Sequence, residues 1–356
     1  MGLSGQISGA DPIELDGVPV ARLPRERVAP GLRAAGLGGM KRESPLVREA
    51  RGLYRLLRLA RMTAGLYRTG RILGRFDVVH ANDLDTLPAA WLLARASRAR
   101  LVYDAHELYT EQEPDPPRLH RAVASTLERA LARRADAVLT VSEPIADELR
   151  RRLRLRETPA AVLNAPERDD TEPQQRPDGP LRAIYQGAMG PGRPLEDLLV
   201  AAEHAPEVRF TLRVAGADLA ALREAAAHLP NVEVVEPVPP DRLVEALRGH
   251  DVGLVINRPV TRNDELVFPN KLFEYLMAGL AVAVPRLPGM TPLVEGEDVG
   301  VTYEPGRPDE LGEELAALAR DPERLGRLRD AARRRALERY NAESQQDALV
   351  RIWRVS

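Results

Sequence analysis

Cysteine is absent from this 356-residue chain, and aromatic residues make up only 4% of it. The missing thiols exclude disulfide bonds, a cysteine nucleophile and cysteine-ligated metal ions, and they are typical of a reducing compartment. Scarce aromatic rings and a formal net charge of −2 argue against a nucleic-acid partner, because base stacking and phosphate contacts need aromatic and basic surfaces. No run approaches the roughly 20 apolar residues of a membrane helix. We therefore expect a globular cytoplasmic protein.

Lysine is almost absent as well. Of the 51 basic residues 49 are arginine, and the only lysines are Lys41 and Lys271. A chain with this bias should keep lysine where a compact ammonium does what a planar guanidinium cannot. Lys41 lies beside Arg42 in a polar stretch, whereas Lys271 lies in an apolar, helix-like segment. The bias therefore favours a functional role for Lys271.

Short apolar segments alternate with amphipathic ones, which predicts an α/β protein with parallel sheets covered on both faces. Residues 165–180 contain four prolines and almost nothing apolar, as in a linker. We predict two doubly wound domains, at 1–164 and 181–338, and a closing helix at 339–356 on the domain junction. The predicted strands are 18–23, 76–80, 100–104, 137–141, 182–186, 208–215, 232–235, 251–256, 280–284 and 299–303, and the main predicted helices of the first half are 45–74 (one or two helices), 84–96, 119–134 and one that Ser142 caps.

A glycine-rich loop follows the first predicted strand of the second domain. Gly187, Gly190 and Gly192 let the backbone approach a phosphate closely, and Arg193 adds a charge that can bind it in a bidentate manner. Because ligands bind at the carboxyl ends of parallel strands, the loop is a candidate phosphate site. An ordinary strand-to-helix turn is the alternative.

The segment 268–279 is the second candidate. Pro269 suits the start of a helix and Gly279 its end. Asn270, Lys271 and Glu274 then lie near the first turn, with the lysine and glutamate one turn apart. Together they can hold a phosphate and a pair of ribose hydroxyls. The alternative is an i,i+3 salt bridge at the surface.

Several segments together resemble the family 4 retaining glycosyltransferases, whose GT-B fold has two Rossmann-like domains facing a cleft. The most specific is PNKLFEY at 269–275, followed by AGLAV at 278–282, which is similar to the family's donor-site signature. The resemblance covers most of residues 76–350, with Ala342 in place of a common tryptophan. The other matching segments are His80–Asp83, Tyr103–Leu108, Ala135–Ser142 and Tyr340–Asn341.

The resemblance implies a hexosyltransferase-like enzyme of glycan biosynthesis that uses a nucleotide-sugar donor. Glu274 would bind the donor ribose, and Lys271 with Arg193 the diphosphate. In this family the departing phosphate oxygen is thought to take the acceptor proton, so stabilising that diphosphate is the main catalytic task. No cofactor and no metal ion are implied. The family's first paired glutamate falls on Leu266, with Glu265 one residue away.

His106 is the candidate in the first domain for contacting the transferring sugar or the acceptor. Asp104 and Glu107 flank it, and so polar a cluster is atypical of a core. The nearby Asp83-Leu84-Asp85 has the spelling of a metal-binding carboxylate pair. We interpret Asp83 or Asp85 as a helix cap, and we predict no metal site.

Residues 41–75 carry ten basic and two acidic residues, a local charge of +8, while the rest of the chain carries −10. The segment also has more apolar residues than one buried stripe requires. A basic amphipathic helix is typical of a membrane-surface element. A lipid-linked acceptor at the inner face of the membrane would explain it. The alternative is a solvated arginine face.

Two other functions remain open. Family members open with a strand, a glycine-rich loop and a helix before the segment resembling Asp16–Val20, and Met1 lies only 15 residues before it. We therefore expect a first domain that lacks its usual first strand. Either the recorded start of the sequence is too late, or the protein is a non-catalytic accessory partner of a glycosyltransferase. A sugar-nucleotide epimerase of the same fold is the other alternative, although its acidic and histidine residues are not found.

Overall fold

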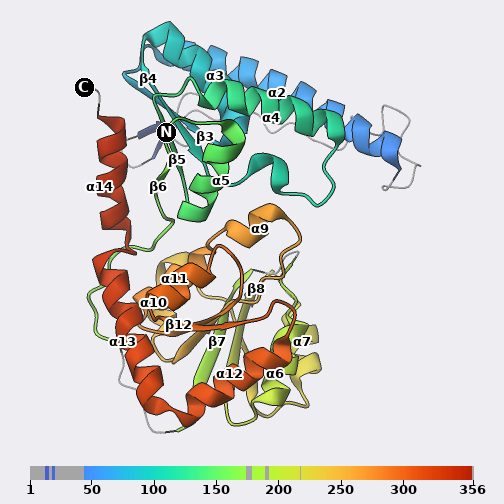
Figure 1. Cartoon of the computed structure of the whole chain (residues 1–356), viewed down its shortest axis with the longest axis vertical. Coiled ribbons are helices and arrows are strands. Elements are labelled where there is room, and N and C mark those ends of the chain that lie inside the picture. Colours follow the sequence, from blue (N-terminus) through green and yellow to red (C-terminus); the bar gives the residue numbers. More distant parts are fainter. Residues whose placement is uncertain are drawn as a thin grey trace. The chain divides into compact units, whose positions relative to one another are not determined.

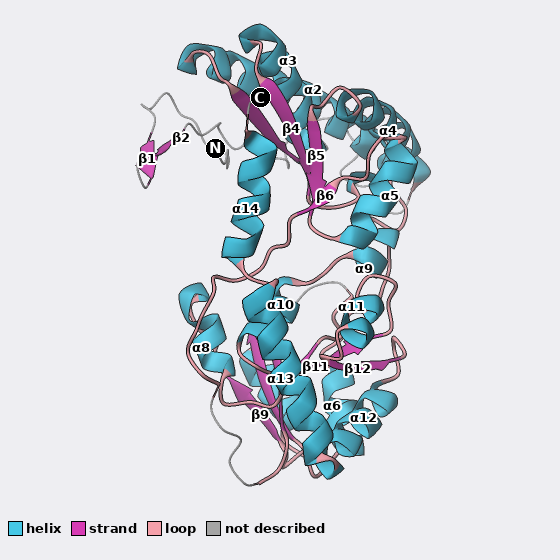
Figure 2. Cartoon of the chain, turned by 60° about the vertical axis from the view of Figure 1, so that its left-hand side comes forward, coloured by secondary structure: helices cyan, strands magenta, loops and turns pink. Residues whose placement is uncertain are grey.

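The computed structural model describes residues 44–173, 179–188, 192–216 and 218–354, and the backbone alone at 13–15 and 18–20. The chain divides into two compact units. One comprises Met1–Ala161 with Arg351–Ser356, and the other Val162–Val350. Figure 1 labels the elements of both units, and Figure 2 distinguishes their helices from their strands.

The first unit is built on a parallel sheet in the order β3-β4-β5-β6. The strand expected at 18–23 is found at 18–20, but it pairs antiparallel with residues 13–15 in a separate two-stranded sheet. The strands are β1 (Ile13–Leu15), β2 (Val18–Val20), β3 (Val78–Asn82), β4 (Arg100–Ala105), β5 (Ala137–Thr140) and β6 (Ala160–Ala161).

Helices cover this sheet. The segment expected as one or two helices is a single 29-residue helix, α2, which packs on α3 and α4. Glu49 of α2 accepts the backbone N–H groups of Arg118 and Leu119, and so caps α4, whose own N-cap residue is a proline. Ser142 caps α5 as predicted. The helices are α2 (Pro45–Leu73), α3 (Asp83–Ser97), the short η1 (Tyr109–Glu111), α4 (Arg118–Ala132) and α5 (Glu143–Leu153).

The second unit has a six-stranded sheet in the order β12-β11-β10-β7-β8-β9, parallel throughout. Each strand predicted for this half is present, with ends that differ by a few residues. The α/β prediction is therefore confirmed. The strands are β7 (Arg182–Ala188), β8 (Arg209–Ala215), β9 (Val232–Val235), β10 (Val252–Leu254), β11 (Ala281–Pro285) and β12 (Gly300–Tyr303).

The second sheet has an apolar core on each face, as a doubly wound domain requires. Helices α6 and α12 bury leucines in one core, α8, α10 and α11 fill the other, and α13 contributes to both. The helices are α6 (Glu196–His204), α7 (Leu219–Ala226), η2 (Pro240–Arg242), α8 (Leu243–Leu247), α9 (Arg262–Leu266), α10 (Asn270–Met277), α11 (Thr291–Gly296), α12 (Pro308–Arg320), α13 (Pro322–Glu338) and α14 (Ala342–Trp353).

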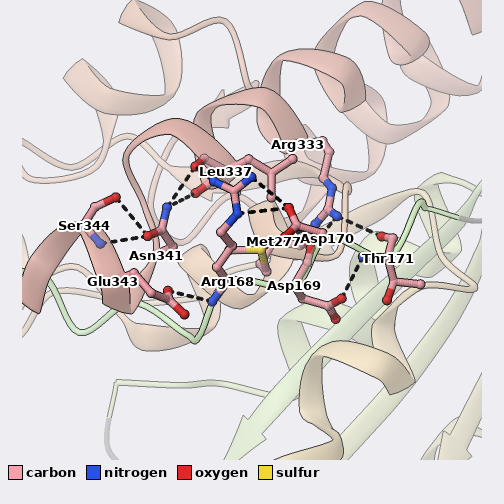
Figure 3. Close-up of polar contacts among 11 residues, drawn as sticks. Arg168, Asp169, Asp170, Thr171, Met277, Arg333, Leu337, Asn341, Glu343 and Ser344 are labelled. Atoms are coloured by element: carbon pink, nitrogen blue, oxygen red, sulfur yellow. Dashed lines mark hydrogen bonds and ion pairs between the residues drawn. The ribbon is translucent and has the colours of Figure 1, made fainter.

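The closing helix expected at 339–356 is found as α14, and the chain breaks between α13 and α14. Asn341 holds both sides of the break. Its Nδ2 donates to the carbonyls of Ala336 and Leu337, and its Oδ1 accepts from the backbone and the hydroxyl of Ser344. One buried amide thus satisfies the end of one helix and the start of the next (Figure 3).

Residues 165–173 of the expected linker are hydrogen-bonded to helices of the second unit (Figure 3). Arg333 of α13 donates to the carbonyls of Asp169 and Thr171, and Arg168 donates to the carbonyl of Leu337. The backbone N–H of Arg168 also donates to Glu343 of α14. Arginine side chains therefore replace the apolar contacts that this proline-rich stretch cannot make.

Candidate functional site

The site of the second unit lies where its strand order reverses. From β7 the chain proceeds to β8 and β9 on one side, whereas β10, β11 and β12 lie on the other. Ligands of such sheets bind in the crevice at the carboxyl ends of the two central strands. Here those ends are Gln186–Ala188 of β7 and the residues that follow Leu254 of β10.

Tyr275 of α10 links the two strands whose ends form this crevice. Its hydroxyl accepts the N–H of Gln186 at 2.9 Å and lies 3.2 Å from the carbonyl of Leu254, so one fully buried side chain links both strands. The ring lies against Gly253, where any Cβ would overlap it. Glycine at 253 is therefore needed for α10 to lie this close to the sheet.

Lys271 is the central side chain of the crevice. It is 7% exposed, and its Nζ has no hydrogen-bond partner within the described structure. The Nζ lies 4.0 Å from the centre of the Tyr185 ring, and a Cβ added to Gly187 would lie 2.5 Å from it. Burial lowers its pKa to about 7, the charge of Arg193 adds to this, and Glu274 opposes it. An unpaired buried amine beside a second cation is suited to bind an anion.

Glu274 lies one turn from Lys271, and a residue of the sheet holds its carboxylate in place. Its Oε2 accepts from Nε2 of Gln186 at 3.3 Å, and Oε1 of Gln186 accepts from Arg213 of β8 at 2.8 Å. Burial raises the pKa of Glu274, and the hydrogen bond from Gln186 opposes that rise. The sequence reasoning missed Gln186. A buried polar residue at the end of an otherwise apolar strand was the available signal.

The glycine-rich loop is described only in part, since Gly190 lies outside the described residues. Gly192 has a φ of +71°, and a Cβ there would lie 2.8 Å from the carbonyl of Arg258. Its carbonyl also accepts the N–H of Arg258 at 2.8 Å, so glycine allows two backbones to meet. Arg193 donates to the carbonyl of Ala188 at 3.2 Å, and its charge acts on Lys271.

The other two predicted donor residues lie differently. Asn270 is exposed as the first residue of α10. Glu265 is ion-paired with Arg262 of the same helix, α9, so its charge is engaged locally. Leu266, which occupies the position of the family's first glutamate, is buried.

In the first unit, polar side chains gather at the carboxyl ends of β3 and β4. Oδ2 of Asp104 lies 3.2 Å from Nε2 of His80 and 3.3 Å from Nε2 of His106. Burial raises the pKa of Asp104, but the hydrogen bonds from the two histidines outweigh it and the net pKa is lowered. The hydrogen bond to Asp104 raises the pKa of His106, and the charges of Asp83 and Glu107 add to this. His106 is 39% exposed and thus open to a ligand.

The capping interpretation of Asp83 and Asp85 is wrong. Helix α3 begins at Asp83 itself, after Asn82, and no side chain caps it. Asp83 has a φ of +56° and accepts the backbone N–H of His106 at 3.0 Å, while Asp85 accepts the hydroxyl of Tyr109 at 2.7 Å. The two carboxylates hold the loop after β4, and with it the position of His106.

A cavity of about 260 Å³ opens in the first unit beside this loop. Helix α2 contributes Arg55, Arg58 and Met62 to its wall, and Arg55 is held by a bidentate pair with Glu113. The cavity therefore combines charged groups with apolar surface from the same helix. Its other lining residues are Leu59, Asp85, Tyr109, Thr110, Gln112, Pro116, His120 and Arg121.

The described residues contain no group of three or more histidine, aspartate or glutamate side chains arranged to hold a metal ion. None of the helices described here has the length and apolar character needed to cross a bilayer.

Two family models match this chain, one in each half. Residues 4–166 match the family described as Glycosyl transferase 4-like domain, and residues 193–351 match the family described as Glycosyl transferase-like. No curated protein matches the chain in sequence.

Solved structures share the fold at low sequence identity. HepE from Anabaena, in complex with UDP, is 16% identical with a TM-score of 0.64, over 82% of this chain and 80% of that one. Sucrose-phosphate synthase from Thermosynechococcus elongatus is 17% identical with a TM-score of 0.62, over 78% and 73%. TarM from S. aureus is 12% identical with a TM-score of 0.58, and this chain spans 78% of its own length but only 55% of TarM. The two matched domains, one in each half of the chain, and the fold shared with these structures therefore indicate a glycosyltransferase with the GT-B fold.

Proposed function

We propose that this protein transfers a sugar from a nucleoside-diphosphate sugar to an acceptor hydroxyl, with retention of the anomeric configuration. The observation that carries the proposal is the buried amine of Lys271, which has no hydrogen-bond partner among the described residues and lies at the crevice where the strand order reverses. A diphosphate would be an anionic partner for this amine. HepE structures with UDP and with UDP-glucose make uridine diphosphate the first nucleotide to test.

In the proposed reaction the sugar–phosphate bond breaks and the acceptor oxygen forms the new bond on the same face of the sugar. The departing phosphate oxygen takes the acceptor proton. Lys271 and Arg193 stabilise the diphosphate as its charge grows, which is an electrostatic form of catalysis. Glu274, oriented by Gln186, accepts hydrogen bonds from the ribose hydroxyls. His106 contacts the transferring sugar or the acceptor from the first unit.

The test is calorimetry with a panel of nucleoside diphosphates, followed by a donor-hydrolysis assay. We expect binding of one nucleotide, weakened by Lys271→Ala by about 1.5–3 kcal/mol, as for a lost charge-assisted contact. Arg334→Ala, an exposed arginine of α13, is the matched control and should bind as the wild type. Absence of binding by every nucleotide sinks the proposal, and binding without turnover of any donor favours the accessory role.

Turnover is expected to require neither a cofactor nor a divalent metal, because side chains supply the charge at the diphosphate. Dialysis against a chelator should leave the rate within about twofold, too small a change for the loss of a Lewis acid. The rate with and without added magnesium or manganese measures this. Activity that disappears with the chelator and returns with either metal contradicts the prediction.

We further propose a lipid-linked acceptor, reached at the cytoplasmic face of a membrane through α2. Leu46, Leu53 and Leu57 are 72%, 52% and 56% exposed, and their spacing of seven and four residues places them on one helix face. Arg58 and Arg68 are exposed on the same helix. An apolar stripe flanked by arginines matches an element lying at a lipid interface.

Co-sedimentation with anionic vesicles should detect this contact at low salt and show it falling at physiological salt. The variant Arg58→Glu/Arg68→Glu should lose most of the binding. Arg55, paired with Glu113, is not suited to the test. Arg327→Glu/Arg334→Glu makes the same charge change on α13 and is the control. No binding of the wild type at low salt indicates a soluble acceptor instead.

A further inference from the structure

Four side chains of the first unit form one continuous chain of hydrogen bonds. Nε1–H of Trp353, in the last turn of α14, donates to Nδ1 of His80 at 2.9 Å. On its other side His80 faces Oδ2 of Asp104 through Nε2, and the same oxygen faces Nε2 of His106. The reactive end of this chain is His106, and its far end is a tryptophan that the proposed reaction does not use.

Two further contacts hold this end of α14, one to the main chain beside Trp353 and one to its ring. Arg100, the first residue of β4, donates from Nε to the carbonyl of Ile352 at 3.0 Å. The indole ring meets the His80 imidazole edge-on, with ring centres 5.7 Å apart. Although the side chain of Trp353 is 40% exposed, its N–H therefore has a fixed direction.

This direction determines which nitrogen of His80 carries a proton. Indole N–H is only a donor, so Nδ1 of His80 must present its lone pair. The proton of the neutral imidazole then lies on Nε2, which donates it to Asp104. While the indole N–H occupies Nδ1, the lone pair of that nitrogen is engaged in the hydrogen bond. Asp104 consequently faces the Nε2–H of His80 on one side and Nε2 of His106 on the other.

We propose that Trp353 is a positioning residue for His106: by engaging Nδ1 of His80, and so holding the Nε2–H form of that ring, it reserves the charge of Asp104 for His106. Without the indole N–H, Nδ1 of His80 is open to protonation. A charged His80 would then compete with His106 for the same carboxylate oxygen. The role of Trp353 in turnover rests on the proposed function of His106, whereas the role of Trp353 in the hydrogen-bond chain does not.

Three acidic side chains near His106 raise its pKa. Asp104 acts through the hydrogen bond, and Asp83 and Glu107 act through their charge. Asp83 comes from α3, and Asp104 and Glu107 belong to β4 and the loop that follows it. Asp104 also contacts His80. A change at Trp353 should therefore reach His106 through Asp104.

The test is Trp353→Phe in the full chain, which keeps an aromatic ring and removes only the donor. The chain has six histidines and two tryptophans, so its imidazole NMR signals can be assigned with His80→Gln and His106→Gln. We expect the imidazole nitrogen shifts of His80 to lose the Nε2–H pattern, and the pKa of His106 to fall by about half a unit to one unit. We also expect kcat to fall about 10-fold with KM for the donor unchanged, because the change alters the position of one contacting group.

Trp91→Phe alters the other tryptophan, which lies in α3 beside Arg95, and is the control. It should leave the His106 titration and the rate unchanged. An unchanged titration of His106 in Trp353→Phe, with folding verified by denaturant, overturns the proposal. If that titration shifts but His106→Gln retains full turnover, the hydrogen-bond chain stands and the proposed role of His106 fails.

Discussion

Replacing Lys271 with methionine is expected to stabilise the protein while it weakens nucleotide binding about 10- to 100-fold, as for a lost charge-assisted contact. The amine is buried and has no partner in the described structure, so the free protein bears the cost of its burial. Methionine has a similar length and no charge. We expect the free energy of unfolding at pH 6 to rise by about 2–4 kcal/mol, measured by denaturant titration. Higher stability together with weaker binding is a typical result of replacing a functional side chain.

The pH dependence gives this prediction a second signature. The folded-state pKa of Lys271, about 7, lies below the ordinary value of 10.5. Between these two values the unfolded chain holds a proton that the folded protein has lost, so stability rises with pH across that window. Below pH 7 the full cost of burying the ammonium is present. Lys271→Met should therefore gain most stability at pH 6 and least at pH 10.

Nucleotide affinity should depend on pH in the opposite sense. A diphosphate pairs with the ammonium form, which becomes scarce in the free protein above pH 7. Affinity in the wild type should thus decline as the pH rises from 7 to 9, and Lys271→Met should lose this dependence. Calorimetry at three pH values measures it.

Lys271→Arg separates charge from shape. Arginine keeps the charge but cannot lose its proton, and its larger, planar guanidinium replaces a compact ammonium that lies close against the backbone of Gly187. We therefore expect neither gain in stability nor recovery of binding. Wild-type affinity in Lys271→Arg, or lower stability in Lys271→Met at pH 6, would show that the amine is not held as described.

Gly253→Ala is expected to lower the free energy of unfolding by about 2–3 kcal/mol, because the new methyl group overlaps the Tyr275 ring. The displaced ring would release the hydroxyl that links β7 to β10. Helix α10 carries both Tyr275 and Lys271, so nucleotide affinity should fall as well. Denaturant titration and calorimetry on the same variant measure the two effects.

Gly249→Ala is the matched control, since a Cβ at Gly249 meets nothing within 4 Å. Its stability should stay within about 0.5 kcal/mol of the wild type. The double variant Gly253→Ala/Tyr275→Ala should lose less than the sum of the single variants, because the methyl group then enters space that the ring occupied. Additive losses would mean that Gly253 and Tyr275 do not compete for this space.

The sequence by itself determined most of the fold. Apolar runs such as 281–285 and 252–254 match the parallel strands because both faces of those strands are covered. Helix α10 begins after Pro269 and ends before Gly279, whose φ is +75°, since these residues restrict or permit the backbone locally. The sequence also pointed to Lys271 and to its one-turn spacing from Glu274. Local conformation and composition were sufficient for these predictions.

Only the tertiary structure decided how side chains from distant segments meet. Gln186 reaches Glu274, and Trp353 reaches His80, across 88 and 273 residues. Asp83 and Asp85 bind the loop after β4, where local pattern indicated a helix cap. The sequence also could not predict whether the amine of Lys271 pairs with Glu274, because an i,i+3 spacing on a helix permits both a paired and an unpaired side chain. Such contacts depend on which strand ends adjoin in the sheet, and that order is set by packing of the whole domain rather than by any local stretch.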